Sequence, residues 1–307
     1  MPKTTPFRVN IQSCAIASVA DSGMMKKVAG DRLETASCRS MNLARLSSIG
    51  IGGVADVFMI DSGKYPDNAY LVGAANNILF GPDLPPLMKL SKTFDFIRME
   101  NRKLTVGAAT PAGKVVSFCK KNDIGNFEFL SHLPGTLGGI LKMNAGLKEY
   151  EIFENLIALR TKDGWLAKEE IAYGYRTTDI KDVIFEAVFR TVQGFDASKI
   201  EMFREMRTNQ PAEPSAGSAF KNPPGDYAGR LIEKAGLKGY RLGDMAFSEM
   251  HANFLVNLGN GTFEDASALI QLAQKKVHKQ TGIWLENEII IVDRRYQGES
   301  SPLKADH

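Results

Sequence analysis

Short apolar segments separated by glycines characterise this 307-residue chain from residue 41 onward. Residues 49–53 read IGIGG and precede the apolar run 54–60, and the run 70–72 leads into 73–77 (GAANN). Short apolar runs bounded by glycine are typical of strands joined by tight turns. The pattern therefore predicts a sheet whose backbone comes very close to another group.

Helical spacing appears between these strands, so the chain mixes both kinds of element. Thr262 and Asp265 resemble a capping box, which predicts a long helix that ends near Gly282. A proline-rich break at 210–214 is the best candidate for a domain boundary. Further strands are predicted at 104–108, 156–161, 184–192, 253–258 and 288–292, and further helices at 115–119, 199–208 and 228–235. The isoleucines of the last strand predict that it is fully buried.

Charge limits the classes of partner. The chain carries 38 basic and 35 acidic residues, and its 44% apolar share is that of a protein with a real core. Residues 1–40 hold six basic and three acidic residues, so the rest is balanced at 32 of each sign. Because nucleic-acid-binding proteins usually have a basic face, this balance argues against a nucleic acid partner without excluding an acidic small ligand. Residues 1–40 lack sustained periodicity and are predicted to be an N-terminal extension.

Cysteine and histidine usage points to a reducing compartment. Cys14, Cys38 and Cys119 are unclustered and odd in number, which does not suit a disulfide framework. None of the four histidines has metal-ligand spacing, so we expect no metal. No apolar run approaches the roughly 18 residues needed to cross a bilayer. We therefore expect a cytoplasmic protein with no membrane partner.

Two glycine-rich loops, at 73–77 and 135–139, are candidates for anion binding. Small residues let consecutive backbone amides point at a pyrophosphate. Neither loop has the G-x-G-x-x-G spacing of a Rossmann turn or the G-x-x-x-x-G-K of a P-loop. For either loop taken alone, a turn that needs positive φ is the simpler explanation. A dinucleotide would be bound here by another architecture.

The segment 217–223 (GSAFKNP) places a serine beside a glycine, with Lys221 and Asn222 as partners for phosphate or sugar. It is not a nucleophile elbow, because G-x-S-x-G needs glycine two residues to each side of the serine. Two interpretations of Ser218 stay open on spacing alone. Its hydroxyl is free at a site, or it caps the helix that is expected from near residue 226.

Three other polar residues also have two interpretations each. Arg176 is either solvated or an anchor for a carboxylate or phosphate. Glu288 lies at the start of the isoleucine run. It is either a carboxylate that a functional site uses or a residue at the solvent-exposed start of a strand. His251 fits a structural histidine better than a catalyst.

Taken in order, the motifs resemble one family, the UDP-N-acetylenolpyruvoylglucosamine reductases (MurB), from about residue 41 to 293. The short span between Arg176 and Pro211 resembles the shorter type, which lacks a tyrosine-bearing insertion. The chain departs from the family at 73–77, where alanines replace two glycines of G-G-G-S-N. The matching segments are 51–56 (IGGVAD), 133–139 (LPGTLGG), 143–146 (MNAG), 175–176 (YR), 217–223 (GSAFKNP), 228–239, 251–254 (HANF) and 285–289 (LENEI).

The resemblance implies an α+β fold in two parts. An FAD-binding domain of the vanillyl-alcohol-oxidase (PCMH) type, made of two subdomains, would occupy 41–200 and be completed by the strand at 285–293. A MurB C-terminal α+β substrate domain would occupy 201–284, followed by a tail at 294–307. We expect this molecule to be a monomer.

The resemblance also implies the activity and the site. FAD would be the cofactor and NADPH the hydride donor, and the enolpyruvyl ether of a UDP-sugar would be reduced. Ser218 would donate a proton, while Arg176 and Glu288 would bind and polarise the enolpyruvyl carboxylate. The UDP-sugar would be held by Tyr175, Lys221 and Asn222. FAD would be held by Gly52, Gly53, Gly73, Ala74, Ala75, Asn76, Asn77, Gly135, Thr136, Gly138, Gly139, Asn144, Ala145 and Gly146.

Two other functions stay open on the residues. A flavin oxidase of the same fold would share the FAD loops but not the segments 217–223 and 285–289. A protein that only binds FAD or a nucleotide-sugar is the second, and the intact Ser218, Arg176 and Glu288 argue against it. No site for an adenine 2′-phosphate is identifiable, so the preference for NADPH rests on the resemblance.

Overall fold

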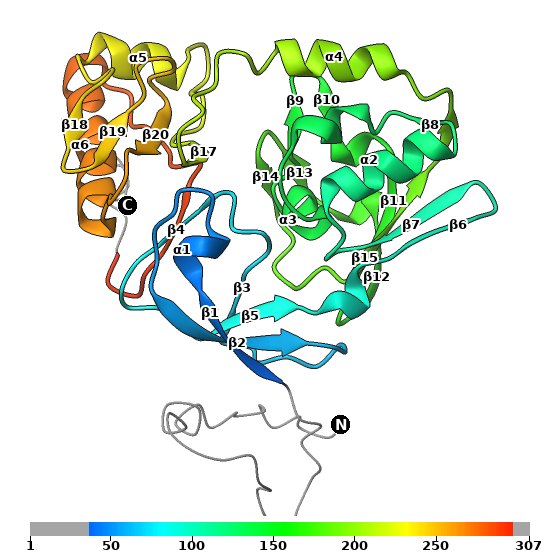
Figure 1. Cartoon of the computed structure of the whole chain (residues 1–307). Coiled ribbons are helices and arrows are strands. Elements are labelled where there is room, and N and C mark those ends of the chain that lie inside the picture. Colours follow the sequence, from blue (N-terminus) through cyan, green and yellow to red (C-terminus); the bar gives the residue numbers. More distant parts are fainter. Residues whose placement is uncertain (1–36, 297–307) are drawn as a thin grey trace, which may run out of the picture.

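The computed structural model describes residues 37–296, which form three units (Figure 1). The first unit contains a four-stranded sheet in which β1 and β2 are antiparallel while β2, β5 and β3 run parallel. Its elements are β1 (Cys38–Asn42), α1 (Leu43–Leu46), β2 (Val54–Ile60), β3 (Tyr70–Leu71) and β5 (Leu87–Leu90). The predicted run 54–60 is confirmed as β2. β1 begins at Cys38, three residues before the domain start predicted at 41, and residues 1–36 lie outside the described part.

The last strand of the chain returns to this first unit. β21 (Ile290–Val292) pairs in parallel with β4 (Ile78–Phe80), with Ile290 opposite Ile78. The prediction that the isoleucine run is fully buried is wrong, because Ile290 is 36% exposed. Ile289, just before the strand, and Val292, at its end, are buried, so exposure is confined to the start of β21. Ile290 and Val292 lie on the same face of the strand, and burial on that face increases from one to the other.

The second unit is a five-stranded antiparallel sheet covered by helices (Figure 1). The sheet order is β12 (Gly164–Ala167), β11 (Leu156–Thr161), β15 (Glu186–Arg190), β7 (Lys103–Gly107) and β6 (Ile97–Glu100). The helices are α2 (Ala112–Lys121), α3 (Leu137–Lys142) and α4 (Ala197–Glu205). Three two-stranded pairs complete the unit: β9 (Gly146–Leu147) with β10 (Tyr150–Glu151), β13 (Tyr173–Gly174) with β14 (Thr177–Thr178), and β8 (Ile124–Gly125) with β16 (Val192–Gln193).

Most predicted elements of the second unit are confirmed with shifted ends. The strand predicted at 156–161 is β11, and the short helix predicted around 115–119 is the centre of α2. The strand predicted at 184–192 is divided, because β15 ends at Arg190 and the chain then leaves the sheet to pair with β8. The helix predicted at 199–208 begins earlier, since Asp196 caps α4 by accepting from the Ser198 amide at 2.9 Å.

The third unit packs two helices on a small antiparallel sheet. Its sheet order is β17 (Ser215–Ser218), β20 (Phe254–Asn257), β19 (Met245–Phe247) and β18 (Arg241–Leu242), and its helices are α5 (Ala228–Lys234) and α6 (Phe263–Thr281). The predicted helix start at Thr262 is confirmed, because the Asp265 amide donates to Thr262 Oγ1 at 3.1 Å. The Asp265 carboxylate accepts from the Thr262 hydroxyl at 2.8 Å rather than from its backbone amide, so the capping box is only half formed. No helix within residues 37–296 is both long and apolar enough to span a membrane.

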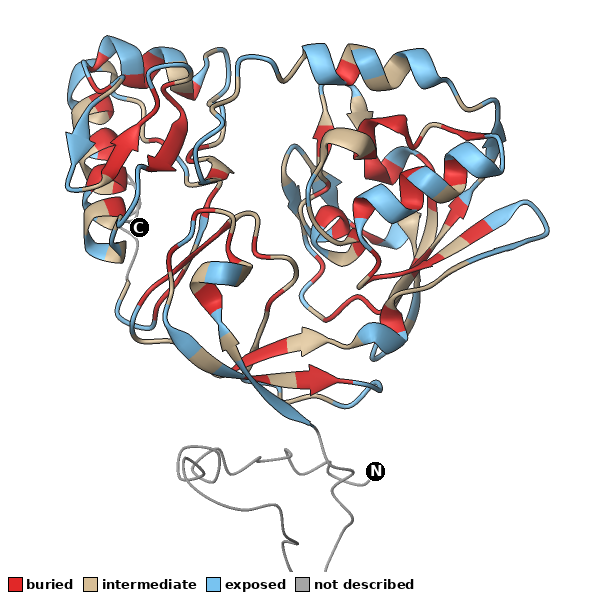
Figure 2. Ribbon diagram, in the orientation of Figure 1, coloured by how far each residue is buried: buried red, intermediate tan, exposed pale blue. Residues whose placement is uncertain are grey.

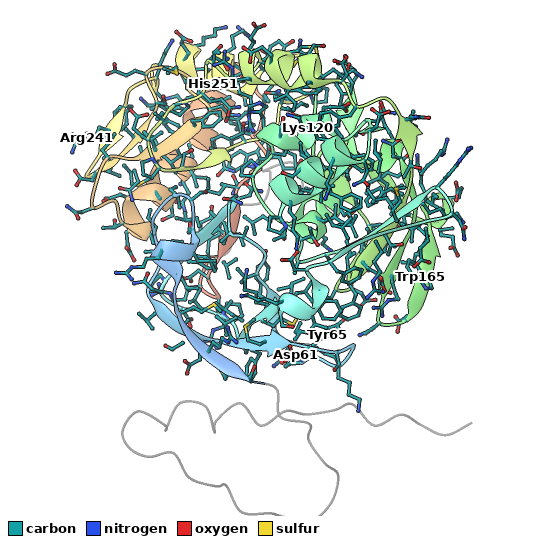
Figure 3. The ribbon with its side chains drawn as sticks, turned by 45° about the vertical axis from the view of Figure 1, so that its right-hand side comes forward. Asp61, Tyr65, Lys120, Trp165, Arg241 and His251 are labelled. Carbon is teal, nitrogen blue, oxygen red and sulfur yellow. The ribbon has the colours of Figure 1, made fainter. Side chains whose placement is uncertain are left out.

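Separate apolar cores hold the units together (Figure 2). The core of the third unit extends to Ile49, Ile51 and Leu79 of the first unit. Asn257 reinforces this joint, since its Nδ2 donates to the Ile49 carbonyl at 2.9 Å. The second and third units each pack against the first unit, and Trp165 and Arg241 mark their opposite edges (Figure 3).

Candidate active site

The segment that carries Ser218 is fixed from two sides. Asn253, buried at the start of β20, holds Phe220 by both ends of its amide: Nδ2 donates to the Phe220 carbonyl at 2.8 Å and Oδ1 accepts from the Phe220 amide at 3.0 Å. On the other side, the amides of Glu288 and Lys221 donate to the carbonyls of Ala219 and Glu286, each at 2.9 Å. The segments 217–223 and 285–289, far apart in sequence, therefore lie side by side.

Ser218 ends β17 beside a bulge, where Gly217 adopts a φ of +77°. This conformation strongly favours glycine, so it explains the Gly-Ser pair. The interpretation of Ser218 as a helix cap is wrong, because the amide of Ala228 at the start of α5 donates to Asn222 Oδ1 at 3.0 Å instead. No residue within 37–296 is recorded as a hydrogen-bond partner of the Ser218 hydroxyl.

Arg176 is held at the tip of the hairpin formed by β13 and β14. Its φ of +55° lies in the left-handed region, which is costly for a side chain of this size. Its Nη2 donates to the Gly146 carbonyl at 2.7 Å, and its Nε lies 3.4 Å from Glu288 Oε1. The two side chains are only 17% and 16% exposed. Arg176 is therefore not a solvated arginine, and its use as an anchor for a carboxylate or phosphate stays a prediction.

Glu288 lies beside the buried run that follows it. Burial raises the pKa of this carboxyl, and the adjacent guanidinium of Arg176 lowers it with a smaller effect. The raised pKa means that this carboxyl takes up a proton more readily than an exposed glutamate does. Glu288 is therefore more than the exposed mouth of a strand, whereas Glu286, two residues earlier, is exposed and pairs with Lys221 at 2.7 Å.

The Met143–Gly146 segment supports the same hairpin. Asn144, fully buried with a φ of +44°, donates from Nδ2 to the Gly174 carbonyl at 3.1 Å and to Glu151 Oε2 at 2.8 Å. Asn77 donates from Nδ2 to the Glu288 carbonyl at 2.9 Å. Asn144 Oδ1 is buried without a protein partner. The sequence suggested these asparagines as FAD contacts and gave no signal that they also position the hairpin and the final strand.

The loop 73–77 uses its carbonyls and its amides differently. Four of its five carbonyls accept from protein donors: Lys89 Nζ donates to Gly73, Ser48 donates to both Ala75 and Asn76, and the Ile290 amide donates to Asn77. Within residues 37–296, none of the five amides of this loop donates to a protein acceptor. A row of free amides in a loop of small residues suits a phosphate.

The second glycine-rich loop faces the first. A methyl group added at Gly73 would lie 3.2 Å from Thr136 Oγ1, and one added at Gly135 would lie 3.5 Å from Asn76 Nδ2. The structure therefore brings together the two loops that the sequence singled out. We call residues 73–77 and 135–139 together the amide cradle.

Not every candidate glycine faces open space. An added methyl would lie 2.8 Å from Leu43 Cβ at Gly52 and 3.0 Å from Ala108 Cβ at Gly138, so close packing explains both. The amide of Gly138 already donates to the Ala108 carbonyl at 2.8 Å. Gly53 and Gly139, by contrast, have no atom within 4 Å of an added methyl. These two positions remain open to a ligand.

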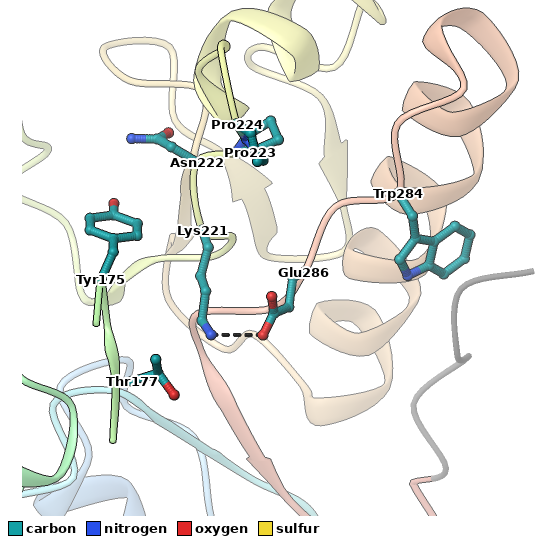
Figure 4. A pocket seen from close by; sticks show the side chains of 8 residues that line it. All are labelled: Tyr175, Thr177, Lys221, Asn222, Pro223, Pro224, Trp284 and Glu286. Atoms are coloured by element: carbon teal, nitrogen blue, oxygen red, sulfur yellow. Dashed lines mark hydrogen bonds and ion pairs between the residues drawn. The ribbon is translucent and has the colours of Figure 1, made fainter. Parts of the chain in front are cut away.

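A pocket of about 390 Å³ adjoins Ser218's segment and the hairpin (Figure 4). The three residues suggested for UDP-sugar binding are all in its lining, which consists of Tyr175, Thr177, Lys221, Asn222, Pro223, Pro224, Trp284 and Glu286. Burial raises the pKa of Tyr175, whose hydroxyl is hydrogen-bonded by Asn222. The pocket thus offers a lysine, an amide and a neutral phenol to a polar ligand.

One residue near the site escaped the sequence reasoning. The motif 251–254 and the predicted strand 253–258 both include Asn253 without assigning it a role, although a buried asparagine in an apolar strand signals a structural clamp. His251, whose Nδ1 accepts from the Asn253 amide at 3.2 Å and whose pKa is lowered by burial, fits its structural interpretation. Residues 37–296 contain no cluster of three or more metal-ligating side chains.

Comparison with known proteins supports the resemblance. The C-terminal domain family of UDP-N-acetylenolpyruvoylglucosamine reductase matches residues 210–292. The reductase of Helicobacter hepaticus is 43% identical over 257 residues, and that of Campylobacter jejuni is 44% identical; the alignments cover 82% of this chain and 98% and 99% of the relatives. The crystal structure of the enzyme (MurB) from Thermus caldophilus superposes with a TM-score of 0.73 at 27% identity and covers 83% of this chain and 99% of its own. With its fold class confirmed by this neighbour, the chain belongs to the UDP-N-acetylenolpyruvoylglucosamine reductase (MurB) family.

Proposed function

We propose that this flavin-dependent oxidoreductase reduces UDP-N-acetyl-enolpyruvoylglucosamine to UDP-N-acetylmuramate, a precursor of peptidoglycan, with FAD as cofactor and NADPH as reductant. Membership of the family supports the reaction. The observation that carries the proposal is the convergence of Arg176, Glu288 and the Ser218 segment next to the amide cradle and the pocket. Three separate stretches of chain meet there.

The amide cradle fits FAD because it offers what a pyrophosphate needs. The free amides of 73–77 and the facing loop at 135–139 would hold the two phosphates, and the open positions at Gly53 and Gly139 would allow close approach. The unpartnered Asn144 Oδ1 would accept from a polar group of the cofactor. When bound, FAD supplies the hydride equivalent that NADPH delivers and that the substrate receives at C3.

Ser218 would donate the proton that completes the reduction. Hydride addition at C3 of the enolpyruvyl group leaves negative charge at C2 and its carboxylate, and a positioned hydroxyl can protonate C2. The bulge at Gly217 and the clamp by Asn253 hold the serine backbone, while its hydroxyl has no recorded protein partner. The side chain is therefore free to turn toward a ligand.

Arg176 and Glu288 would stabilise the charge that develops beside Ser218. The guanidinium is fixed by the Gly146 carbonyl, so it needs little reorganisation to meet a carboxylate. A protonated Glu288 can donate to the same carboxylate, which its raised pKa favours. Tyr175, Lys221 and Asn222 would hold the UDP-sugar through its phosphates and ribose.

An anaerobic spectral titration tests this function. We expect the purified protein, supplied with FAD, to show a flavin spectrum that bleaches with NADPH and returns when UDP-N-acetyl-enolpyruvoylglucosamine is added. Bleaching that only oxygen reverses would indicate a flavin oxidase instead. Failure to take up flavin would indicate a protein that does not catalyse the reaction, and would direct attention to Ala74 and Ala75.

We also propose a monomer in the cytoplasm that does not bind nucleic acid. The balanced charge of residues 41–307 supports the last of these properties. Size-exclusion chromatography with light scattering should give the mass of one chain, 33.7 kDa. A mass of twice this value would contradict the monomer. A parallel titration with NADH should require a higher concentration than NADPH for the same bleaching.

A further inference from the structure

Lys89 brings a positive charge to the amide cradle, whose own residues are all uncharged. Its Nζ donates to the carbonyl of Gly73, the first residue of the loop 73–77. β5, which carries Lys89, runs parallel to β3, with Met88 opposite Leu71. Because the loop follows β3 directly, Lys89 and the loop meet at the edge of the sheet where both strands end.

The charge of Lys89 has no counter-ion in the described part of the chain. Among residues 37–296, no carboxylate forms an ion pair with its ammonium. The side chain is partly buried, and this burial lowers its pKa. The Gly73 carbonyl is a neutral acceptor, so it replaces water at the ammonium without balancing the charge. An anion bound at the cradle would balance it.

The hydrogen bond from Lys89 also fixes the direction of an amide. The C=O and N–H groups of a trans peptide point in opposite directions, and residues 37–296 contain no cis peptide bond. The Gly73 carbonyl and the Ala74 amide belong to one peptide group. With its carbonyl held by Lys89, this group therefore turns the Ala74 amide toward the opposite side, where it has no acceptor within residues 37–296. Donation from a cation also polarises the peptide and strengthens this amide as a donor.

The next two peptides of the loop are held in the same way by neutral groups. Ser48 donates from its amide to the Ala75 carbonyl at 3.4 Å and from Oγ to the Asn76 carbonyl at 3.1 Å. Ala75 has a φ of +54°, which is unfavourable for a residue with a Cβ, so the loop conformation needs support from outside. Neutral donors can give this support, and the positive charge of Lys89 is not required for it.

We propose that Lys89 is a positioning residue for the pyrophosphate of FAD. It holds the Ala74 amide in place as a donor and supplies the full positive charge that backbone amides lack. The inference deepens the proposed function and rests on it. Lys89 acts through the peptide that joins Gly73 and Ala74, so its effect should appear in the affinity for the cofactor.

Binding of FAD to the flavin-free protein, followed by the change in flavin fluorescence, tests the role of the charge. We expect Lys89→Met to weaken FAD binding roughly 10- to 100-fold, as for a lost hydrogen bond that involves a charged group. Lys89→Gln keeps a neutral donor and should lie closer to Lys89→Met than to wild type. Lys89→Arg keeps the charge and should lie closer to wild type.

Two results of this titration would overturn the proposal. Wild-type affinity in Lys89→Met would show that FAD does not depend on this residue. Wild-type affinity in Lys89→Gln would show that a neutral hydrogen bond to Gly73 is sufficient and that the charge has no role. Lys92 provides the matched control, since it lies three residues later and is exposed. Lys92→Met removes the same charge at the surface and should leave the affinity for FAD unchanged.

Thermal unfolding with and without FAD separates binding from folding. The midpoint without FAD reports the stability of the protein, and its rise on addition of FAD reports binding. We expect Lys89→Met to keep a midpoint near that of wild type without FAD, because the lost hydrogen bond is offset by removal of a desolvated charge, and to show a smaller rise with FAD. A lowered midpoint with an unchanged rise would identify a structural lysine and overturn the proposal.

Failure of the proposed function gives a different result. If the wild-type protein took up no FAD, the cofactor itself would be wrong, and this outcome does not depend on any variant. If the wild-type protein bound FAD and Lys89→Met bound it equally well, the inference about Lys89 alone would fail. Should Lys89→Met not fold, the comparison of Lys89→Gln with Lys89→Arg still tests the charge, and equal affinities in these two variants would overturn the proposal.

Discussion

The amide cradle and the reaction site beside it are built from different parts of the chain. The cradle consists of backbone. In the loop 73–77, four of the five carbonyls accept hydrogen bonds from protein donors, and the amides do not donate to protein acceptors within residues 37–296. The reaction site consists of side chains, with Ser218, Arg176 and Glu288 each supported by backbone contacts of other segments. A site made of backbone amides keeps its hydrogen-bond donors when a side chain is replaced, as long as the added group is small. The reaction site would lose its function on such a replacement, because the reacting atoms belong to the side chains themselves.

The substitution expected to have the largest effect on turnover, and so to test this contrast most directly, is at Ser218. Ser218→Ala removes the hydroxyl that we propose as the proton donor and leaves the cradle intact, so flavin reduction by NADPH should proceed as in wild type. Turnover of the enolpyruvyl substrate should fall at least about a hundredfold, since a positioned acid contributes typically 10²–10⁴ in rate. Stopped-flow measurement of the two half-reactions checks this directly.

Ser218→Cys is the matched control. A thiol can also donate a proton, so this variant should retain more activity than Ser218→Ala. Near-normal turnover in Ser218→Ala would show that Ser218 is not the proton donor. The reaction site would then not depend on this side chain, and the contrast with the backbone amides of the cradle would be lost.

Asn144 lies between the two regions, so its replacement should affect both. Asn144→Ala removes the donor to the Gly174 carbonyl and leaves that carbonyl and Glu151 without this partner. The loss of a buried hydrogen bond should destabilise the protein by about 1–3 kcal/mol and loosen the hairpin that carries Arg176. We expect kcat to fall more than FAD affinity does. Retained kcat with weakened flavin binding would place Asn144 in the cradle alone.

Gly138 and Gly139 sharpen the comparison within the cradle. Gly138→Ala introduces a methyl 3.0 Å from Ala108 Cβ and should destabilise the protein by about 1–3 kcal/mol through overpacking. Gly139→Ala adds a methyl in open space on α3 and should stabilise the flavin-free protein by about 0.5–1 kcal/mol. Denaturant unfolding of the two flavin-free variants measures both effects. If Gly139→Ala weakens FAD binding while it stabilises the protein, close approach of the cofactor accounts for this glycine.

The smallest expected effect is a pH dependence at Glu288. A carboxyl whose folded pKa is raised contributes stability that is present below its unfolded pKa, ordinarily near 4.5, and lost as the pH rises through the folded value. The free energy of unfolding of wild type relative to Glu288→Gln should therefore decrease as the pH is raised above about 4.5. A pH-independent difference between the two proteins would contradict the raised pKa.

Local sequence patterns predicted where helices and strands lie better than they predicted which other segments pack against them. Glycine punctuation located β2, and Thr262 located the start of α6, because these features depend on neighbouring residues. The exposure of Ile290 could not be predicted, because it depends on which other segments cover β21, where Val292 is buried and Ile290 is not. A run of isoleucines indicates a strand but does not say which of its positions will be covered.

The site was predicted in the same uneven way. Motif order identified Ser218, Arg176 and Glu288, and the structure brings Arg176 and Glu288 within 3.4 Å of each other beside the Ser218 segment. The clamps by Asn253 and Asn144 carried no motif that announced them. Their roles arise from contacts between segments that are dozens of residues apart, and a linear pattern does not encode such distances.

The pairing of β21 with β4 has a consequence for synthesis of the protein. β4 ends at Phe80, yet its partner strand is among the last parts to be translated. The ribosome must add more than two hundred residues before the first unit can close, and the Asn77 carbonyl that receives the Ile290 amide waits until then. Cofactor loading should therefore be a late event in the life of a nascent chain. A stop codon placed just before residue 290 should yield polypeptide that keeps the second unit's core but captures little flavin.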